Sequence, residues 1–239
     1  MKTMVWAVVV SRQHDGIAHL WLRRPSRANA LDPETVQRLH RELSLAEARP
    51  ECFAVVIRAE GSSFCAGADV FSSKALTEKP ESLLTFFDEG RRLMERLVTS
   101  RLVSIAVVHG LAAAGGLELV AAADLVIAAE NAKFVDRHAR YGFLPAFGAT
   151  ALLPIRVNRR VATTLLLDGR VLDAQTALAV GLVHRVCRNE EIDEAINEET
   201  TRLGRCAVEA LSNMKGLVNR MAPVTFDAER IAVRRFNHE

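Results

Sequence analysis

The segment His109-Gly-Leu-Ala-Ala-Ala-Gly-Gly-Leu-Glu118 links an apolar run to the start of a helix. The run before it, Val103–Val108, has the length and β-branched composition of a buried strand. Gly115 and Gly116 then open a predicted helix through Ala123, and free amides at a helix start favour negative charge. The segment therefore predicts a strand, a turn with unpaired N–H groups and a short helix, as in a layered α/β domain.

A second segment, Phe64-Cys-Ala-Gly-Ala68, has the same design. A predicted strand over residues 53–57 leads into it, and the small residues that follow cannot form a regular helix or strand throughout. Gly67 allows a tight bend, and Ala68 presents its amide without a bulky side chain in front. We expect the amides of Ala68 and Gly115 to converge on one oxygen atom as an oxyanion hole.

Glu118 is the acid best placed to act beside such a hole. It lies three residues after Gly115, so one helical turn puts its carboxylate on the same side as that amide. It is also the only acid between Glu95 and Asp124, and apolar residues flank it. We predict that Glu118 is a general base or acid.

The remaining pattern alternates strands and helices before becoming mostly helical. Residues 5–10 and 18–22 predict a hairpin around His14-Asp15-Gly16, because Asp-Gly tolerates the positive φ of a tight turn. Asp32 predicts a helix cap, with Pro33 at the first helical position. Further predictions are a helix over 82–99, strands over 124–128 and 132–135 as the last of this layer, and helices from Phe147 onward, interrupted at 182–186 and at Pro223.

Composition excludes several classes of protein. A chain of 239 residues that is 49% hydrophobic can bury a full core in one large domain. Its 31 basic and 29 acidic residues are well mixed, so no patch for nucleic acid or a membrane is evident. The four cysteines form no close pair, which disfavours zinc, other metal sites and disulfides. The apolar run near the N-terminus is too short for a signal sequence or a bilayer span, and we expect a cytoplasmic protein.

Three common enzyme motifs are incomplete. Residues 110–116 begin like a phosphate-binding loop, but Gly116 stands where that motif needs lysine. Residues 61–65 lack the last glycine of a nucleophile elbow, which disfavours a serine hydrolase. No GxGxxG motif follows a strand, so a nicotinamide or flavin enzyme has no support. We expect no cofactor.

Several segments carry motifs that occur together, in the same order, in one known family. They lie at residues 24–31, 64–69, 110–118, 123–128, 131–134, 142–154, 168–170 and 181–183. On these motifs the chain resembles the enoyl-CoA hydratase/isomerase (crotonase) superfamily. The resemblance implies a spiral of β-β-α units over residues 1–185. It also implies a helical region over 186–239 that closes the active site and drives assembly into a trimer, often a dimer of trimers.

The same resemblance implies the substrate class. An acyl thioester of CoA, or of the phosphopantetheine on an acyl-carrier protein, would bind with its carbonyl oxygen at Ala68 and Gly115. CoA would thus be part of the substrate, and Arg27 would meet its phosphates. The residues implied in substrate binding are Arg27, Ala28, Ala66, Gly67, Asp69, Gly116 and Tyr141.

The sequence departs from the hydratase pattern at His138. Aligning Phe134 and Gly142 places His138 where hydratases carry a second catalytic glutamate. Histidine can still move protons near neutral pH, so we predict that it assists Glu118. Ala114 also stands where three consecutive glycines are usual. Hydration or double-bond migration of a 2-enoyl thioester is the reaction that this set of residues favours.

Two other functions stay open. The segment Tyr141-Gly-Phe-Leu-Pro145 and the C-terminal His238 are similar to decarboxylating crotonases of polyketide β-branching, which would use His238 and a lysine, here Lys74 or Lys79. Those decarboxylases usually have an apolar residue at the position of Glu118. The third alternative is a crotonase that binds or scaffolds an acyl thioester without catalysis, and the retained glutamate argues against it.

Overall fold

The computed structural model describes residues 9–70, 79–221 and 224–236. Its strands are β1 (Val9–His14), β2 (Ile17–Leu22), β3 (Ala54–Ala59), β4 (Val103–Val108), β5 (Leu111–Ala113), β6 (Leu125–Ala129), β7 (Lys133–Val135), β8 (Leu172–Asp173) and β9 (Arg185–Cys187). Its α-helices are α1 (Pro33–Glu47), α3 (Pro80–Thr99), α4 (Gly115–Ala122), α5 (Ala149–Arg156), α6 (Arg159–Asp168), α7 (Ala174–Ala179), α8 (Ile192–Gly204), α9 (Val208–Met221) and α10 (Asp227–Phe236).

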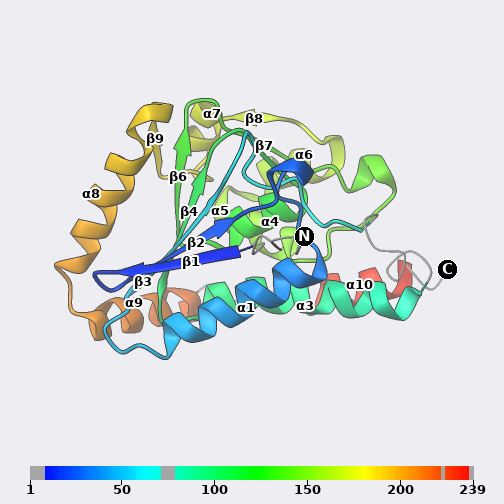
Figure 1. Ribbon diagram of the computed structural model, residues 1–239. Helices are drawn as coiled ribbons and strands as arrows, with labels where there is room; N and C mark the ends of the chain where they lie inside the picture. The colour runs from blue at the N-terminus through cyan, green and yellow to red at the C-terminus, as the bar shows by residue number, and fades with distance from the viewer. Residues whose placement is uncertain (1–8, 71–78, 222–223, 237–239) are drawn as a thin grey trace, which may run out of the picture.

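The strands form two sheets of different size (Figure 1). The six-stranded sheet has the order β1-β2-β3-β4-β6-β9, in which β1 is antiparallel to β2 and every other neighbouring pair is parallel. The smaller sheet has the order β5-β7-β8 and begins directly after β4. Since parallel strands need crossover connections, the helices between them cover the sheet.

Two local predictions at the start of the chain are confirmed. β1 and β2 form a hairpin whose turn residues, Asp15 and Gly16, have φ values of 48° and 75°. Positive φ at both positions matches the twist of the flanking strands. Residues 5–8 of the predicted first strand lie outside the described residues. The α1 cap is also as predicted, since the Asp32 side chain accepts a hydrogen bond from the Thr35 amide at 2.8 Å.

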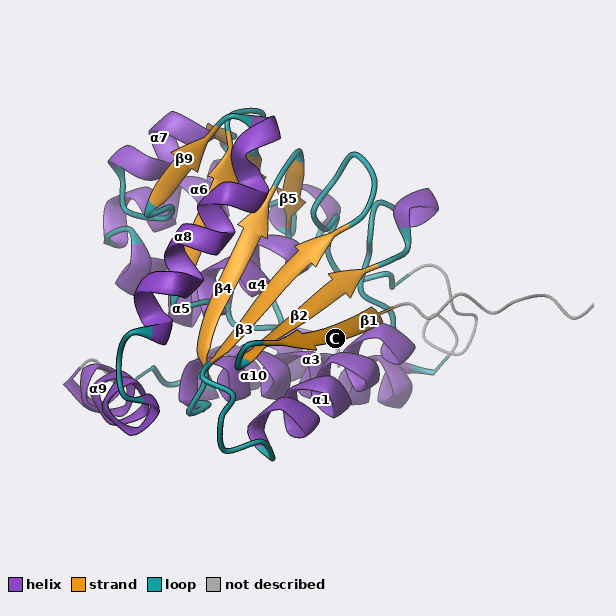
Figure 2. Cartoon of the chain, turned by 60° about the vertical axis from the view of Figure 1, so that its left-hand side comes forward, coloured by secondary structure: helices purple, strands orange, loops and turns teal. Residues whose placement is uncertain are grey.

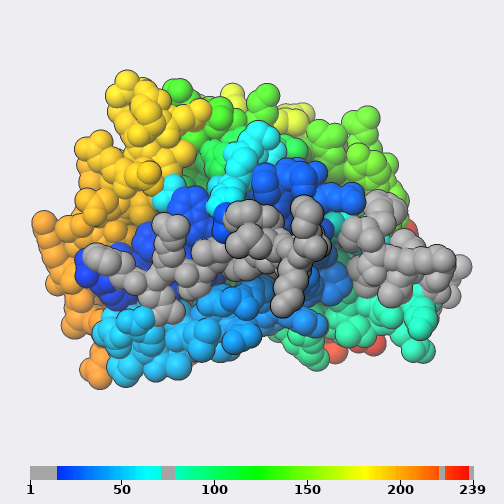
Figure 3. All heavy atoms as spheres, in the orientation of Figure 1, coloured from blue at the N-terminus to red at the C-terminus, as the bar shows by residue number. Residues whose placement is uncertain are grey.

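The large sheet separates two apolar layers. Along β3, Val55 and Ile57 pack into the main core with α1, α3 and α4, whereas Ala54 and Val56 face the opposite side. On that side the partners include Ile196 of α8 and residues of α9. Figure 2 shows α8 against the strands, and Figure 3 shows the gold and orange atoms of α8 and α9 at the left edge of the molecule. The sheet is therefore buried on both faces, as expected of a parallel sheet.

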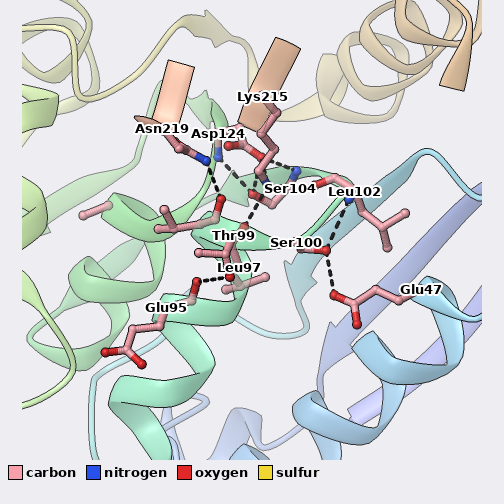
Figure 4. Close-up of polar contacts among 12 residues, drawn as sticks. Glu47, Glu95, Leu97, Thr99, Ser100, Leu102, Ser104, Asp124, Lys215 and Asn219 are labelled. Carbon is pink, nitrogen blue, oxygen red and sulfur yellow. Dashed lines mark hydrogen bonds and ion pairs between the residues drawn. The ribbon is translucent and has the colours of Figure 1, made fainter. Parts of the chain in front are cut away.

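A buried polar cluster attaches α9 to the core (Figure 4). The Lys215 ammonium lies 2.7 Å from a carboxylate oxygen of Asp124 and donates to the carbonyl oxygens of Leu97 and Leu102, both at 2.8 Å. Asp124 in turn accepts from the backbone and hydroxyl of Ser104, both at 2.7 Å. All three ammonium donors thus have an acceptor, which makes burial of this charge tolerable.

One prediction about the sheet was wrong. Residues 124–128 and 132–135 do not end a single layer, because β6 joins the large sheet whereas β7 pairs with β5 and β8. The last strand of the large sheet is β9, near the predicted interruption at 182–186. The physical reason is the turn at Gly110, with φ of 56°, after which the chain extends again as β5 and offers β7 a separate partner. Pro223 lies outside the described residues, and the division at residues 185 and 186 stays a prediction.

Candidate active site

A cavity of about 380 Å³ opens where the smaller sheet, α4 and the segment after β7 meet. Most of its lining is apolar and includes Val70, Phe87, Leu144 and Phe147. The ionisable groups of the lining are Glu118, Arg137, His138 and Tyr141. A mostly apolar cavity with a few convergent polar groups is the usual form of a small-molecule site.

Two backbone amides, those of Ala68 and Gly115, lie close together, and Ala68 is part of the cavity lining. Ala68 forms an isolated parallel bridge with Leu31, whose amide donates to Gly67 and whose carbonyl accepts from Asp69. This pairing uses the groups on either side of the Ala68 amide. Gly115 is the first residue of α4, where an amide has no partner inside the helix. Within the described part of the chain, neither amide nitrogen donates a hydrogen bond.

Close backbone packing brings these two amides together. Cys65 donates to Leu111 and accepts from Ala113, so the loop runs along β5. A Cβ atom on Gly115 would lie 3.1 Å from the Ala68 nitrogen, and one on Gly116 would lie only 2.2 Å from the Cys65 carbonyl oxygen. Glycine is therefore required where α4 begins, since any side chain would push the loop away.

The two carboxylate oxygens of Glu118 are both buried but differ in their hydrogen-bond partners. Its side chain is 1% exposed, and Oε1 accepts hydrogen bonds from the amides of Phe147 at 2.9 Å and Ala149 at 3.0 Å. Oε2 is buried and has no hydrogen-bond partner among the described residues. Burial raises the pKa of Glu118, while the nearby His138 and the two amides oppose that shift. The carboxylate is thus held by one oxygen and leaves the other available.

His138 faces the free oxygen of Glu118. Its Nε2 lies 3.9 Å from Glu118 Oε2, and its Nδ1 lies 2.7 Å from Oδ2 of Asp136, a carboxylate that is 1% exposed. The His138 amide also donates to the other Asp136 oxygen at 2.9 Å. Burial lowers the pKa of His138, but the bond to Asp136 and the charge of Glu118 outweigh burial, and the net pKa is raised. A proton on Nδ1 toward Asp136 leaves Nε2 free to exchange a proton across the 3.9 Å gap.

Sequence reasoning missed Asp136 and the two amides that hold Glu118. The segment Asp136-Arg-His138 lies in a charged stretch that predicts a solvated loop, although both acid and imidazole are largely buried. The available signal was the Asp-x-His spacing, which lets one carboxylate meet both the backbone and the ring of the histidine. The amide of Ala149 opens α5, and that of Phe147 lies two residues before it. No side-chain motif reveals such donors, because every residue carries them.

The other predicted site residues lie at different distances from the cavity. Ala66 and Tyr141 line the cavity, together with Ala68, Glu118 and His138. Gly67 and Gly116 form the buried backbone behind it, and Ala28 accepts from the Ala66 amide at 2.9 Å. Arg27 is exposed, and Asp69 pairs with Arg24 at 3.0 Å. Lys79 is exposed at the start of α3, whereas Lys74 and His238 lie outside the described residues.

These features define a class of protein: an α/β fold with unpaired backbone donors beside a buried carboxylate and a largely buried imidazole. A sequence-family model described as enoyl-CoA hydratase/isomerase matches residues 12–238. The chain belongs to this family. The predicted crotonase family and α/β crotonase fold are therefore confirmed.

Individual relatives agree with this assignment. The chain is 30% identical over 190 residues to the crotonyl-CoA hydratase of Syntrophomonas wolfei, covering 79% of this chain and 72% of that one. It is 28% identical over 213 residues to the short-chain-enoyl-CoA hydratase of Clostridium acetobutylicum, covering 89% and 81%. The crystal structure of an enoyl-CoA hydratase from Mycobacterium avium subsp. paratuberculosis K-10 superposes with a TM-score of 0.86 at 26% identity, covering 99% and 93%.

The described residues also offer little to two other kinds of site. None of the helices there combines the length and hydrophobicity needed to cross a bilayer. Within the same residues, no three His, Cys, Asp or Glu side chains are grouped so that they could hold a metal ion.

Proposed function

We propose that this enzyme adds water to, or moves the double bond of, a 2-enoyl thioester of CoA. Glu118 would act as general base and acid, with His138 as its partner, while the amides of Ala68 and Gly115 hold the thioester oxygen. The observation that carries the proposal is the adjacency of two amides without acceptors and a buried carboxylate with one unpartnered oxygen.

The amide pair suits the charge that develops in such a reaction. Attack of water on the β-carbon, or removal of a proton from the γ-carbon, sends an electron pair through the conjugated system to the thioester oxygen. Two N–H donors aimed at that oxygen stabilise the resulting enolate, and loss of one donor typically costs about 2.7–4 kcal/mol of barrier. Because the surrounding cavity is mostly apolar, water would weaken these hydrogen bonds little.

The proton route follows from the positions of Glu118 and His138. The 3.9 Å between Glu118 Oε2 and His138 Nε2 is too long for a direct hydrogen bond but allows one water or substrate atom to contact both. In hydration, one group takes a proton from water as the C–O bond forms at the β-carbon. The enolate then collapses as the α-carbon receives a proton. The atoms of water are thereby added across the double bond, and the thioester is restored.

Several further assignments belong to this proposal. The names of the relatives, crotonyl-CoA hydratase and short-chain-enoyl-CoA hydratase, favour CoA over an acyl-carrier protein as carrier. The apolar lining suits an acyl chain, and the exposed Arg27 is available to the CoA phosphates. No cofactor is required, because the thioester itself accepts the electron pair. A cytoplasmic location fits such a substrate.

We also propose a trimer, with or without dimerisation of trimers. Met214, Leu217 and Val218 share one side of α9 and are 64%, 55% and 66% exposed. An apolar stripe of this kind on a helix usually marks an interface. Sedimentation at micromolar concentration would test the assembly, and a monomer there would contradict it.

Decarboxylation of a glutaconyl-type thioester and thioester binding without turnover remain the competing functions. The retained Glu118 and its hydrogen bonds favour proton transfer over both. A decarboxylase would prefer a carrier-protein substrate and lose activity in His238→Ala. A scaffold would bind acyl-CoA without converting it.

One experiment separates these functions. The enzyme is incubated with crotonyl-CoA, a 3-enoyl-CoA and 3-methylglutaconyl thioesters on both carriers, and the products are identified by mass, with double-bond isomers of equal mass separated by chromatography. Glu118→Gln should lower hydration or isomerisation about 10²- to 10⁴-fold, the usual contribution of a general acid–base group. The control is Glu199→Gln, which changes another largely buried glutamate, on α8, whose partners His184 and Arg202 lie outside the cavity lining. Unchanged turnover in Glu118→Gln would contradict the proposal.

A further inference from the structure

A third buried carboxylate approaches the site from the C-terminal helix. Glu229 on α10 is 6% exposed, and its Oε2 accepts hydrogen bonds from both the amide and the hydroxyl of Thr150, the amide bond being 2.9 Å long. Its Oε1 is buried without a hydrogen-bond partner among the described residues. A glutamate is seldom buried in this way without a specific role.

Glu229 and Glu118 bind the same turn of the protein. Glu118 accepts from the amides of Phe147 and Ala149, and Glu229 accepts from the next amide, that of Thr150. These are the unpaired donors that precede and open α5, and they are shared between a carboxylate from α4 and one from α10. The two acids are 111 residues apart in sequence, yet the amides that they bind all lie within residues 147–150.

Packing strengthens the contact between α10 and this turn. Phe226, which immediately precedes α10, lies against Gly148, where an added Cβ would come within 2.3 Å of the Phe226 ring. Gly148 adopts φ of 124°, a conformation suited to glycine, and starts α5. The far end of α10 is attached to α3 by the ion pair of Arg234 with Asp88.

We propose that Glu229 is a positioning residue for catalysis: by binding the first turn of α5 from α10, it fixes the two amides that orient Glu118. Seating of the C-terminal helix is thereby coupled to the geometry of the catalytic carboxylate. This inference rests on the proposed function of Glu118, but part of its test does not require turnover.

The charge of Glu229 gives it a second influence on the site. The ionisable groups that face Glu229 are Glu118 from α4, and His138 with its partner Asp136 from the segment after β7. On α10 itself, Arg230 pairs with Asp227 at the solvent-exposed surface. Burial and then the charge of Glu118 raise the pKa of Glu229 to about 8, so it becomes negative only in mildly alkaline solution. There it adds a negative charge near Glu118 and His138.

The test compares Glu229→Gln and Glu229→Ala with Asp227→Asn, a change on the same helix at a carboxylate that is 76% exposed. With crotonyl-CoA as probe at neutral pH, Glu229→Ala should lower kcat about tenfold, as expected for loss of the hydrogen bonds from the amide and hydroxyl of Thr150, and leave KM within about twofold. Wild-type enzyme should show an inflection of kcat near pH 8, and Glu229→Gln should lack it. Asp227→Asn should retain both the rate and the inflection.

A direct titration keeps the inference testable if turnover is absent. With ¹⁵N-labelled histidine, the ring signals of His138 should shift as Glu229 ionises near pH 8 in the wild type and in Asp227→Asn, and this shift should be missing in Glu229→Gln, because the charge of Glu229 acts on the imidazole. A wild-type chain that converts no enoyl thioester would overturn the proposed reaction but not this shift. The same shift of the His138 signals in Glu229→Gln, or a Glu229→Ala variant with wild-type kcat, would overturn the role of Glu229.

Discussion

Replacing Asp136 by asparagine tests how His138 is held and charged. The Asp136 carboxylate is 1% exposed and lies 2.7 Å from His138 Nδ1, so water cannot readily substitute for it. A hydrogen bond between such charged groups contributes about 1.5–3 kcal/mol. If that interaction supports the transition state, turnover should fall about 10- to 150-fold, at 1.36 kcal/mol for each factor of ten.

The pH dependence should change in a defined direction. The negative Asp136 raises the pKa of His138, and neutral asparagine removes that effect, so His138 should lose its proton at a lower pH in the variant. The assay is kcat/KM for crotonyl-CoA across the neutral range, with Asp168→Asn as an exposed control. The reasoning would be refuted if the variant lost activity at the same pH as the wild type in the range where His138 titrates, or if its turnover stayed within twofold of wild type.

Two predictions concern stability. Ala114 has φ of 47° and ψ of −118°, a conformation that costs a non-glycine residue about 1–3 kcal/mol. Ala114→Gly should therefore raise the free energy of unfolding by about 1 kcal/mol, once the larger unfolded-state entropy of glycine is deducted. An unchanged or lower melting temperature would contradict this. Lys215→Met should lower the free energy of unfolding by about 3–5 kcal/mol, because the largely buried carboxylate of Asp124 loses its cation. Adding Asp124→Asn should restore part of that loss in denaturant titrations, and a strictly additive double variant would contradict a direct pairing.

The elements predicted best from sequence depend on residues close together in the chain. The turn at Asp15 and Gly16, the Asp32 cap and the start of α4 at Gly115 are each determined within a few residues. Glycines and capping side chains specify backbone conformation locally, so their positions can be interpreted without knowing the tertiary structure. Glu118 was predicted for the same reason, since its distance from Gly115 along one helix is known in advance.

The features that sequence did not predict depend on distant contacts. Pairing of β5 with β7 joins residues more than twenty positions apart, and β5, with only three residues, has too little pattern to reveal itself. Glu229 meets Thr150 across 79 positions. A buried glutamate on an amphipathic helix has the same local signature as a solvated one, so only the packing of α10 distinguishes them. Asp136 was hidden similarly, because its charged neighbours predict exposure.

The presence of a histidine at position 138, and not a second carboxylate, has a consequence for the charge of the site. Two carboxylates in an apolar cavity would repel one another, and one would have to stay protonated. Here the pair has the same net charge in two forms: neutral Glu118 with neutral His138, and ionised Glu118 with protonated His138. A proton can therefore move between the two side chains without changing the net charge of the site. Asp136 favours the imidazolium form, whereas burial of Glu118 favours the neutral acid. These opposing influences bring the two forms closer in energy, as the proposed function requires of a pair that both takes and returns a proton in one turnover.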